Sequence, residues 1–177
     1  MTRRRSTQVA LAALITVMAA VACGGGGAIR TETTRPSVVL TGWTAVDDAP
    51  GISQLAPDLR GLRIVERVDH EALMRNGEAV RSSTVTFASQ EDAAEARKRG
   101  AGDDYQRDLE RAFRGDTVGH GPGVGLRLRV PRPTGSGSDT VEVYLLARGA
   151  KLTVVELLSA NGFDRALRDR ILRTLSR

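Results

Sequence analysis

The sequence predicts an α+β domain in which an antiparallel β-sheet of about five strands packs against two or three helices. Three observations support this fold class. Asn76-Gly77 separates two alternating segments, as in a tight hairpin. Residues 90–113 change to a helical pattern, which returns at the C-terminus over 163–175. Three further strand-like segments lie between them, so strands and helices come in blocks and not in strict alternation.

Residues 1–22 are expected to be a signal peptide that precedes the fold. Three arginines at positions 3–5 form a basic n-region, and the apolar run over 9–21 is too short to span a bilayer. The sequence Ala20-Val21-Ala22-Cys23 resembles the lipobox of bacterial lipoproteins. The resemblance implies that a signal peptidase cuts before Cys23 and that its thiol carries a diacylglyceryl group.

Cys23 is the only cysteine of the chain and precedes four consecutive glycines. It cannot form a disulfide within one chain, and we interpret it as an anchor on a flexible linker over 23–37. An ordinary secretory signal that leaves a free thiol is the alternative. Because two or more acyl chains hold a protein stably on a membrane, the single domain over 38–177 is expected at the outer face of the cell membrane.

The formal net charge of +5 falls to +2 when residues 1–22 and their three arginines are removed. Aromatic residues make up only 3% of the chain. A small net charge and few aromatic side chains argue against a nucleic-acid partner, because such interfaces need basic patches and stacking platforms. Lys98 and Lys151 are the only lysines, and this preference for arginine is typical of GC-rich coding, as in actinobacteria.

The first elements are a short strand near 38–40, a loop over 47–57 and a long hairpin of 63–75 with 78–88. With Asn76-Gly77 as the two turn residues, the numbers of facing residues add up to about 153. We therefore expect Met74 to face Ala79, Leu73 to face Val80, Val68 to face Val85 and His70 to face Ser83.

Ser89 followed by Asp92 resembles a capping box and predicts that a helix begins there. Gly100 and Gly102 interrupt the helical pattern, which predicts one broken helix or two short helices. From residue 124, apolar and polar residues alternate as in a half-buried strand. Segments 140–147 and 152–159 pair across a turn at 148–149 and, as the most apolar strands, are expected at the centre of the sheet.

The last helix, over 163–175, places Phe163, Leu167, Ile171 and Leu175 on one face. We expect this face to pack on the sheet and the charged residues, Arg168 among them, to lie in solvent. Contact of the basic residues with lipid head groups or with an acidic partner is the alternative. Helices are expected to cover mainly one face of the sheet.

Two stretches carry a resemblance to known domains: VTFASQEDAAEARKR at 85–99 and VYLLARGAKLTVVELLSANGFDRALRDRILRTL at 143–175. Residues 60–177 resemble the extracytoplasmic sensor-like domains of actinobacterial lipoproteins and of membrane serine/threonine kinases. The last strands and helix are also similar to the photosystem oxygen-evolving-protein-like fold. The resemblance implies a non-catalytic binding domain.

The polar residues offer few candidates for a catalytic or metal site. GHGPGVGLRLRV, from residue 119, lacks both the spacing and the lysine of phosphate-binding loops and leads into a strand. His120 lies in this stretch and is a candidate base or metal ligand. His70 is expected to face Ser83, as a base would face a nucleophile. Asp69 points to the opposite side of the strand, so it is poorly placed to orient His70. Asp47-Asp48, Asp103-Asp104 and Asp116 could together bind a cation. Acidic residues in loops and at helix starts, however, are usually solvated or cap the helix. The sequence therefore predicts no cofactor and no metal.

The sequence therefore predicts a lipid-anchored lipoprotein of the cell envelope that is not an enzyme. Its extracytoplasmic domain would be a binding module for a protein partner or for a small apolar or amphiphilic ligand held between helix and sheet. A closed apolar cavity would favour the ligand, and an exposed apolar patch would favour the protein partner. The alternative function is an envelope hydrolase that uses His120 or His70 as a base.

Overall fold

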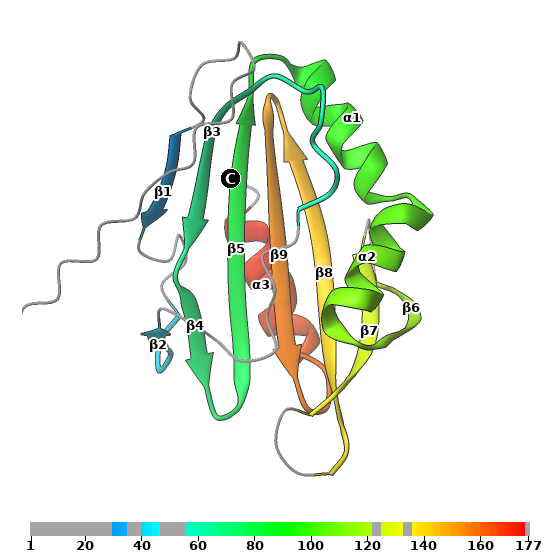
Figure 1. Ribbon diagram of the computed structural model, residues 1–177. Helices are drawn as coiled ribbons and strands as arrows, with labels where there is room; N and C mark the ends of the chain where they lie inside the picture. Colours follow the sequence, from blue (N-terminus) through cyan, green and yellow to red (C-terminus); the bar gives the residue numbers. More distant parts are fainter. Residues whose placement is uncertain (1–29, 35–39, 47–55, 122–124, 133–135, 176–177) are drawn as a thin grey trace, which may run out of the picture.

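The computed structural model describes residues 30–34, 40–46, 56–121, 125–132 and 136–175 (Figure 1). For residues 30–34 and 120–121 the description covers the backbone alone. The expected signal peptide, Cys23 and Asp47-Asp48 lie outside the described residues. The described part is an α+β fold with one large sheet and three helices, as the sequence predicts in outline.

Nine strands form one sheet in the order β1-β3-β5-β9-β8-β7-β6, with β4 beside β5 and β2 beside β4. Eight of them pair antiparallel, and β1 joins the edge parallel to β3. The sheet is larger than the expected five or so strands. The strands are β1 (Arg30–Thr34), β2 (Thr44–Val46), β3 (Ile64–His70), β4 (Ala72–Arg75), β5 (Glu78–Phe87), β6 (Asp116–Gly121), β7 (Gly125–Pro131), β8 (Ser138–Arg148) and β9 (Lys151–Ser159).

The additional strands have weak sequence signals. Strand β6 includes the glycines at 119 and 121, and glycine contributes no side chain to an alternating pattern. Strand β1 lies within the segment expected to be a linker, and β2 follows a tight turn. Most of the short strand expected near 38–40 lies outside the described residues. The first arm of the long hairpin is divided into β3 and β4.

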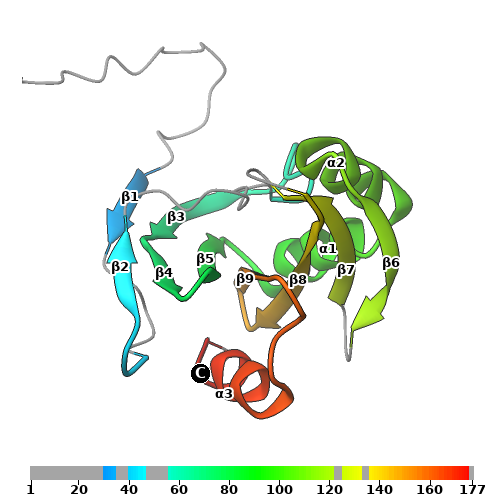
Figure 2. The same ribbon diagram turned by 90° about the horizontal axis from the view of Figure 1, so that it is seen from below.

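Helices α1 (Gln90–Gly100) and α2 (Asp103–Phe113) lie on one face of the sheet, and α3 (Arg165–Leu175) lies on the other (Figure 2). The expectation that helices cover mainly one face is therefore wrong. The physical reason is visible in β9, where every residue from Leu152 to Ser159 is buried. Continuous burial is typical of a strand that is covered on both faces, and β8 and β9 do lie at the centre of the sheet.

Each face carries its own hydrophobic core. The larger core, under α1 and α2, includes Val85, Phe87, Leu109, Leu128 and Val143. The core on the opposite face joins α3 to the sheet, and Trp43 stacks on Phe163 there with ring centroids 6.1 Å apart. Its buried residues are Leu40, Leu73, Val80, Tyr144, Val155, Leu157, Phe163 and Ile171.

The pairing around Asn76-Gly77 confirms part of the expected register. Leu73 faces Val80 and Met74 faces Ala79, and both turn residues have positive φ. Glu71, between β3 and β4, is an extra residue that shifts the pairing by one position. Val68 therefore faces Thr84 and not Val85.

The helix boundaries follow the expected signals. The Ser89 hydroxyl accepts a hydrogen bond from the Asp92 backbone N–H at 3.1 Å, which confirms the cap of α1. The helical pattern forms two separate helices, because the chain leaves helical geometry at Gly102. Among the described helices, none is long and apolar enough to cross a membrane.

Candidate functional site

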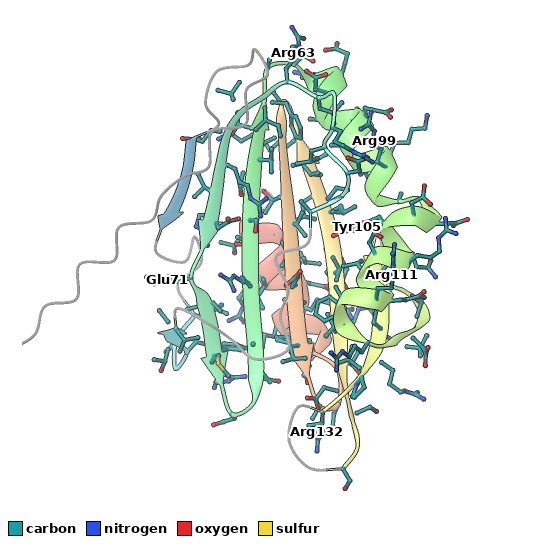
Figure 3. All side chains as sticks on the ribbon, in the orientation of Figure 1. Arg63, Glu71, Arg99, Tyr105, Arg111 and Arg132 are labelled. Atoms are coloured by element: carbon teal, nitrogen blue, oxygen red, sulfur yellow. The ribbon has the colours of Figure 1, made fainter. Side chains whose placement is uncertain are left out.

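A groove of about 1000 Å³ lies along α2, and we call it the α2 groove. It runs between α2, the end of α1 and the segment after Pro57, and Figure 3 labels Arg99, Tyr105 and Arg111 along it. Four arginines and four acidic residues line it, so its formal charges balance. The charged lining residues are Asp58, Arg60, Arg99, Asp104, Arg107, Asp108, Glu110 and Arg111.

The arginines of the α2 groove are paired within the groove or beside it. Arg60 contacts the Asp58 carboxylate at 2.8 Å. On α2, Asp104 pairs with Arg107, and Asp108 with Arg111, each one helical turn apart. Exposed pairs of this kind are worth about 0–1 kcal/mol each, so a charged partner can exchange with them at little cost.

Arg99 has a structural role. Its Nη1 donates to the carbonyl oxygens of Arg60 at 2.8 Å and Asp58 at 3.3 Å, and its Nε donates to Glu95 at 3.0 Å. The guanidinium thereby ties the end of α1 to the segment before β3. It forms a fixed wall of the α2 groove.

Two carboxylates of the α2 groove stay ionised near neutral pH. The hydrogen bonds from Arg60 lower the pKa of Asp58 to about 2. Hydrogen bonds from Thr117 and Gln106 lower the pKa of Glu110. A general acid needs a raised pKa, so these two carboxylates are suited to binding charge and not to donating protons.

A buried polar cluster lies beneath the α2 groove. Tyr105 lines the groove and is 3% exposed, and burial followed by the charge of Glu156 raises its pKa. Glu156 on β9 faces Arg81 on β5, and both side chains are buried. The void beside Arg81 and Glu156 measures about 10 Å³, which is room for about one water molecule.

A second buried cluster lies on the opposite face, under α3. Glu142 is 2% exposed and accepts hydrogen bonds from the Tyr144 hydroxyl at 2.5 Å and from Arg127 Nη2 at 3.1 Å. Nη1 of Arg168 lies 3.6 Å from the same carboxylate. The expectation that Arg168 lies in solvent is wrong, because this buried carboxylate draws the guanidinium inward.

Another hollow, of about 790 Å³, lies where several strands end, and we call it the strand-end groove. It is bounded by the Asn76-Gly77 turn, by Arg132 and Asp139 at the ends of β7 and β8, and by the turn after β9. Figure 3 labels Arg132 at this end of the sheet. Met74 and Leu158 give the groove an apolar part.

The two histidines do not share a site. His70 is the last residue of β3 and His120 lies in β6, with β5, β9, β8 and β7 between them. At the usual strand spacing of about 4.8 Å this separates them by about 24 Å along the sheet. Ser83 faces Asp69 and not His70, and Asp69 pairs with Arg67 at 3.1 Å.

The candidate metal ligands are dispersed. Asp103 and Asp104 lie in the first turn of α2, and Asp116 faces Arg129 at the start of β6. Within the described ranges, no group of three or more His, Cys, Asp or Glu side chains is placed to hold a metal ion.

Sequence reasoning missed the two buried glutamates and their arginines. The available signal is a single acidic residue inside an apolar strand, as in Val141-Glu142-Val143 and Val155-Glu156-Leu157. A charge in a strand buried on both faces requires a partner of opposite sign.

No protein-family model, no curated protein and no solved structure matches this chain.

Proposed function

We propose that this chain is a lipid-anchored protein of the cell envelope whose α+β domain is a non-catalytic binding module. The lipobox-like sequence that ends at Cys23 supports the anchor. The α2 groove supports binding of another envelope protein, because it offers paired surface charges of both signs. Held on the membrane by its anchor, the domain would have a raised effective concentration toward partners there.

The observation that carries this proposal is the charge balance of the α2 groove. Its exposed Asp–Arg pairs are weak contacts that a partner with complementary charges can replace. The void of about 10 Å³ beside Glu156 is too small for a ligand held between helix and sheet. A surface partner therefore fits the described residues better than an enclosed ligand.

The hydrolase alternative has less support. His70 and His120 lie on strands that have four other strands between them, and Ser83 faces Asp69. Nucleophile and base must lie within hydrogen-bond reach of each other, which the register of β3 and β5 does not favour for His70 and Ser83.

The anchor is tested by expressing the full chain in an actinobacterial host and comparing it with Cys23→Ser. We expect the wild-type protein in the membrane fraction, with the mass of residues 23–177 plus acyl groups. Cys23→Ser should lose the acyl mass and leave the membrane fraction. A wild-type protein that carries no acyl group would contradict the anchor.

The binding role is tested by crosslinking in intact cells followed by mass spectrometry. The double variant Arg107→Glu/Arg111→Glu reverses charge in the α2 groove, and Arg165→Glu/Arg170→Glu is the matched control on the exposed face of α3. We expect the groove variant to lose a crosslinked partner that the wild type and the control retain. Equal yields from all three proteins would contradict a docking role for this groove.

A further inference from the structure

The strand-end groove differs from the α2 groove in its lining. The half-buried Met74 supplies apolar surface, to which Leu158, only 5% exposed, adds a small edge, and polar side chains stand around them. An apolar part with a few converging polar groups is typical of small-molecule sites, whereas an evenly charged lining is not.

The charge accessible in the strand-end groove is positive. The Arg132 side chain is 38% exposed, while its partner Asp139 is 13% exposed. The Arg75 side chain is 38% exposed, while its partner Glu78 is 25% exposed. In both pairs the carboxylate lies deeper than the guanidinium. Because the Arg75 guanidinium also lies over the Trp43 ring, 4.9 Å from its centroid, Arg132 is the cation that a ligand meets first.

Hydrogen-bond donors remain available in this groove. Arg132 uses Nε for Asp139 at 2.9 Å, and within the described part of the chain its two Nη atoms have no hydrogen-bond partner. The exposed side-chain amides of Asn76 and Asn161 also lack partners among the described residues. A planar guanidinium with both Nη atoms available matches a carboxylate or a phosphate.

The groove has firm walls. The Ser159 hydroxyl donates to the Gly162 carbonyl at 3.1 Å and accepts from the Asn161 backbone N–H at 3.3 Å. On another side the Asn76-Gly77 turn holds two tightly paired strands. Because these turns are already ordered, a ligand would pay little to order them.

We propose that the strand-end groove binds a small amphiphile with an anionic head group. The head group lies at the Nη atoms of Arg132, and the apolar part lies on Met74 and Leu158. This inference rests on the proposed binding role and names the ligand chemistry of a second groove. The shared chemistry is an oxyanion on an apolar body, whether a carboxylate or a lipid phosphate supplies it.

The test uses the full chain in nanodiscs of zwitterionic phosphatidylcholine, titrated by calorimetry against an empty-nanodisc blank. Hexyl phosphate is the main probe, inorganic phosphate lacks the apolar part, and hexyl glucoside lacks the charge. We expect saturable binding of hexyl phosphate that is at least about 10-fold tighter than that of either comparison probe. Tighter binding of hexanoate than of hexyl phosphate would identify the head group as a carboxylate, and the reverse would identify it as a phosphate.

Variants separate the two parts of the site. Arg132→Gln should weaken hexyl phosphate by about 10- to 100-fold, the loss typical of a charged hydrogen-bonding partner. Asp139→Asn keeps the guanidinium and removes its competing carboxylate, so binding should be equal or tighter. Met74→Gln should weaken hexyl phosphate but not inorganic phosphate. Arg165→Gln, on α3, is the matched control and should bind like the wild type.

Equal binding of hexyl phosphate and inorganic phosphate, or of hexyl phosphate and hexyl glucoside, would overturn the proposal. So would an Arg132→Gln protein that binds hexyl phosphate like the wild type. If Arg132→Gln fails to fold, the Asp139→Asn and Met74→Gln results decide the matter. If hexyl phosphate does not bind but the partner still crosslinks at the α2 groove, the ligand proposal fails and the proposed function stands. If hexyl phosphate binds as expected but no partner crosslinks, only the proposed docking role of the α2 groove fails.

Discussion

The two faces of the sheet each bury one glutamate with arginine and tyrosine nearby, but they use it differently. On the α1 and α2 face, Glu156 and Arg81 belong to neighbouring central strands, so the charges lie within the sheet itself. On the other face, Glu142 lies on β8 and receives Arg168 from α3. The Arg81–Glu156 pair thus links two strands of the sheet, whereas the Arg168–Glu142 pair links helix α3 to the sheet.

This difference shows how each helical layer is held. Helices α1 and α2 cover the larger apolar core and depend little on a single polar contact. Helix α3 covers the smaller core, and its Arg168–Glu142 contact is a larger share of its attachment. Trp43, the only tryptophan of the chain, stacks on Phe163 just before α3 and therefore reports on that attachment.

Glu142→Ala should have the largest effect, lowering the free energy of unfolding by about 3–5 kcal/mol, because it leaves the buried Arg168 without its carboxylate. Trp43 fluorescence should change in the folded protein as the end of α3 loosens. Chemical denaturation followed by circular dichroism and fluorescence measures both effects. Glu156→Ala is the control on the other face and should destabilise without changing Trp43 emission in the folded state. A loss below about 1 kcal/mol for Glu142→Ala would contradict the role assigned to the α3 contact.

Substituting one glycine on each face should have the next largest effect. A Cβ on Gly125 would lie 2.7 Å from Cε1 of the Tyr144 ring, which is held by Glu142. Gly125→Ala should therefore cost about 1–3 kcal/mol. A Cβ on Gly100 would meet the end of the Leu145 side chain at 2.2 Å and Pro57 at 3.3 Å.

Gly100→Ala should cost less than Gly125→Ala, because the Leu145 side chain can turn and alanine favours the helix by about 1 kcal/mol. Thermal denaturation of the two variants gives the order. The opposite order would mean that the α1 and α2 core is packed more rigidly than the α3 core.

Alkaline pH should weaken both faces through their tyrosines. Burial raises the pKa of Tyr105 and of Tyr144 well above the ordinary value of 10.0, with Glu156 and Glu142 respectively adding to the effect. Above pH 10 the unfolded state loses these protons while the folded state keeps them. Stability is therefore fully present below that pH and falls at about 1.4 kcal/mol per pH unit for each tyrosine as the pH rises toward the folded pKa.

Urea denaturation between pH 9 and 11 measures this slope. Tyr105→Phe and Tyr144→Phe should each reduce the slope of the unfolding free energy against pH by the contribution of one tyrosine. Slopes that match the wild type in both variants would show that other groups control the alkaline transition.

The helix caps should give the smallest effect. Ser89 caps α1, and the Asp164 carboxylate accepts from the Leu167 backbone N–H at 3.0 Å at the start of α3. Ser89→Ala and Asp164→Ala should each cost about 1 kcal/mol. If α3 is the less firmly held layer, amide hydrogen exchange should rise along the whole of α3 in Asp164→Ala, but only in the first turn of α1 in Ser89→Ala. Equal, local changes in both helices would contradict that ranking.

Local signals in the sequence were sufficient for much of the fold. Asn76-Gly77 specifies a turn with two positive φ angles, and Ser89 with Asp92 specifies a cap, because only neighbouring residues take part. The register beyond Glu71 was not predictable from the turn, since an extra residue in one strand leaves the hydrophobic pattern locally plausible in both registers.

The sites were less predictable than the fold, because they depend on contacts between distant residues. Arg168 has the spacing of a solvated helix residue, and only its contact with the distant Glu142 on β8 explains its burial. The α2 groove joins residue 58 to residue 111, and the strand-end groove joins three separate turns. The residue pattern within a single helix or strand does not reveal such contacts between distant segments.

The bulge at Glu71 determines which kinds of genetic change this chain tolerates. On β3, the odd-numbered residues Arg67 and Asp69 lie on the same face of the sheet as Val85. On β4, beyond the bulge, it is the even-numbered Met74 that lies on this face. Replacing the Glu71 side chain leaves this arrangement intact. Losing its codon would turn every side chain of β3 to the other face of the sheet and bury the wrong set. We therefore expect the fold to tolerate substitutions of Glu71 but not its deletion.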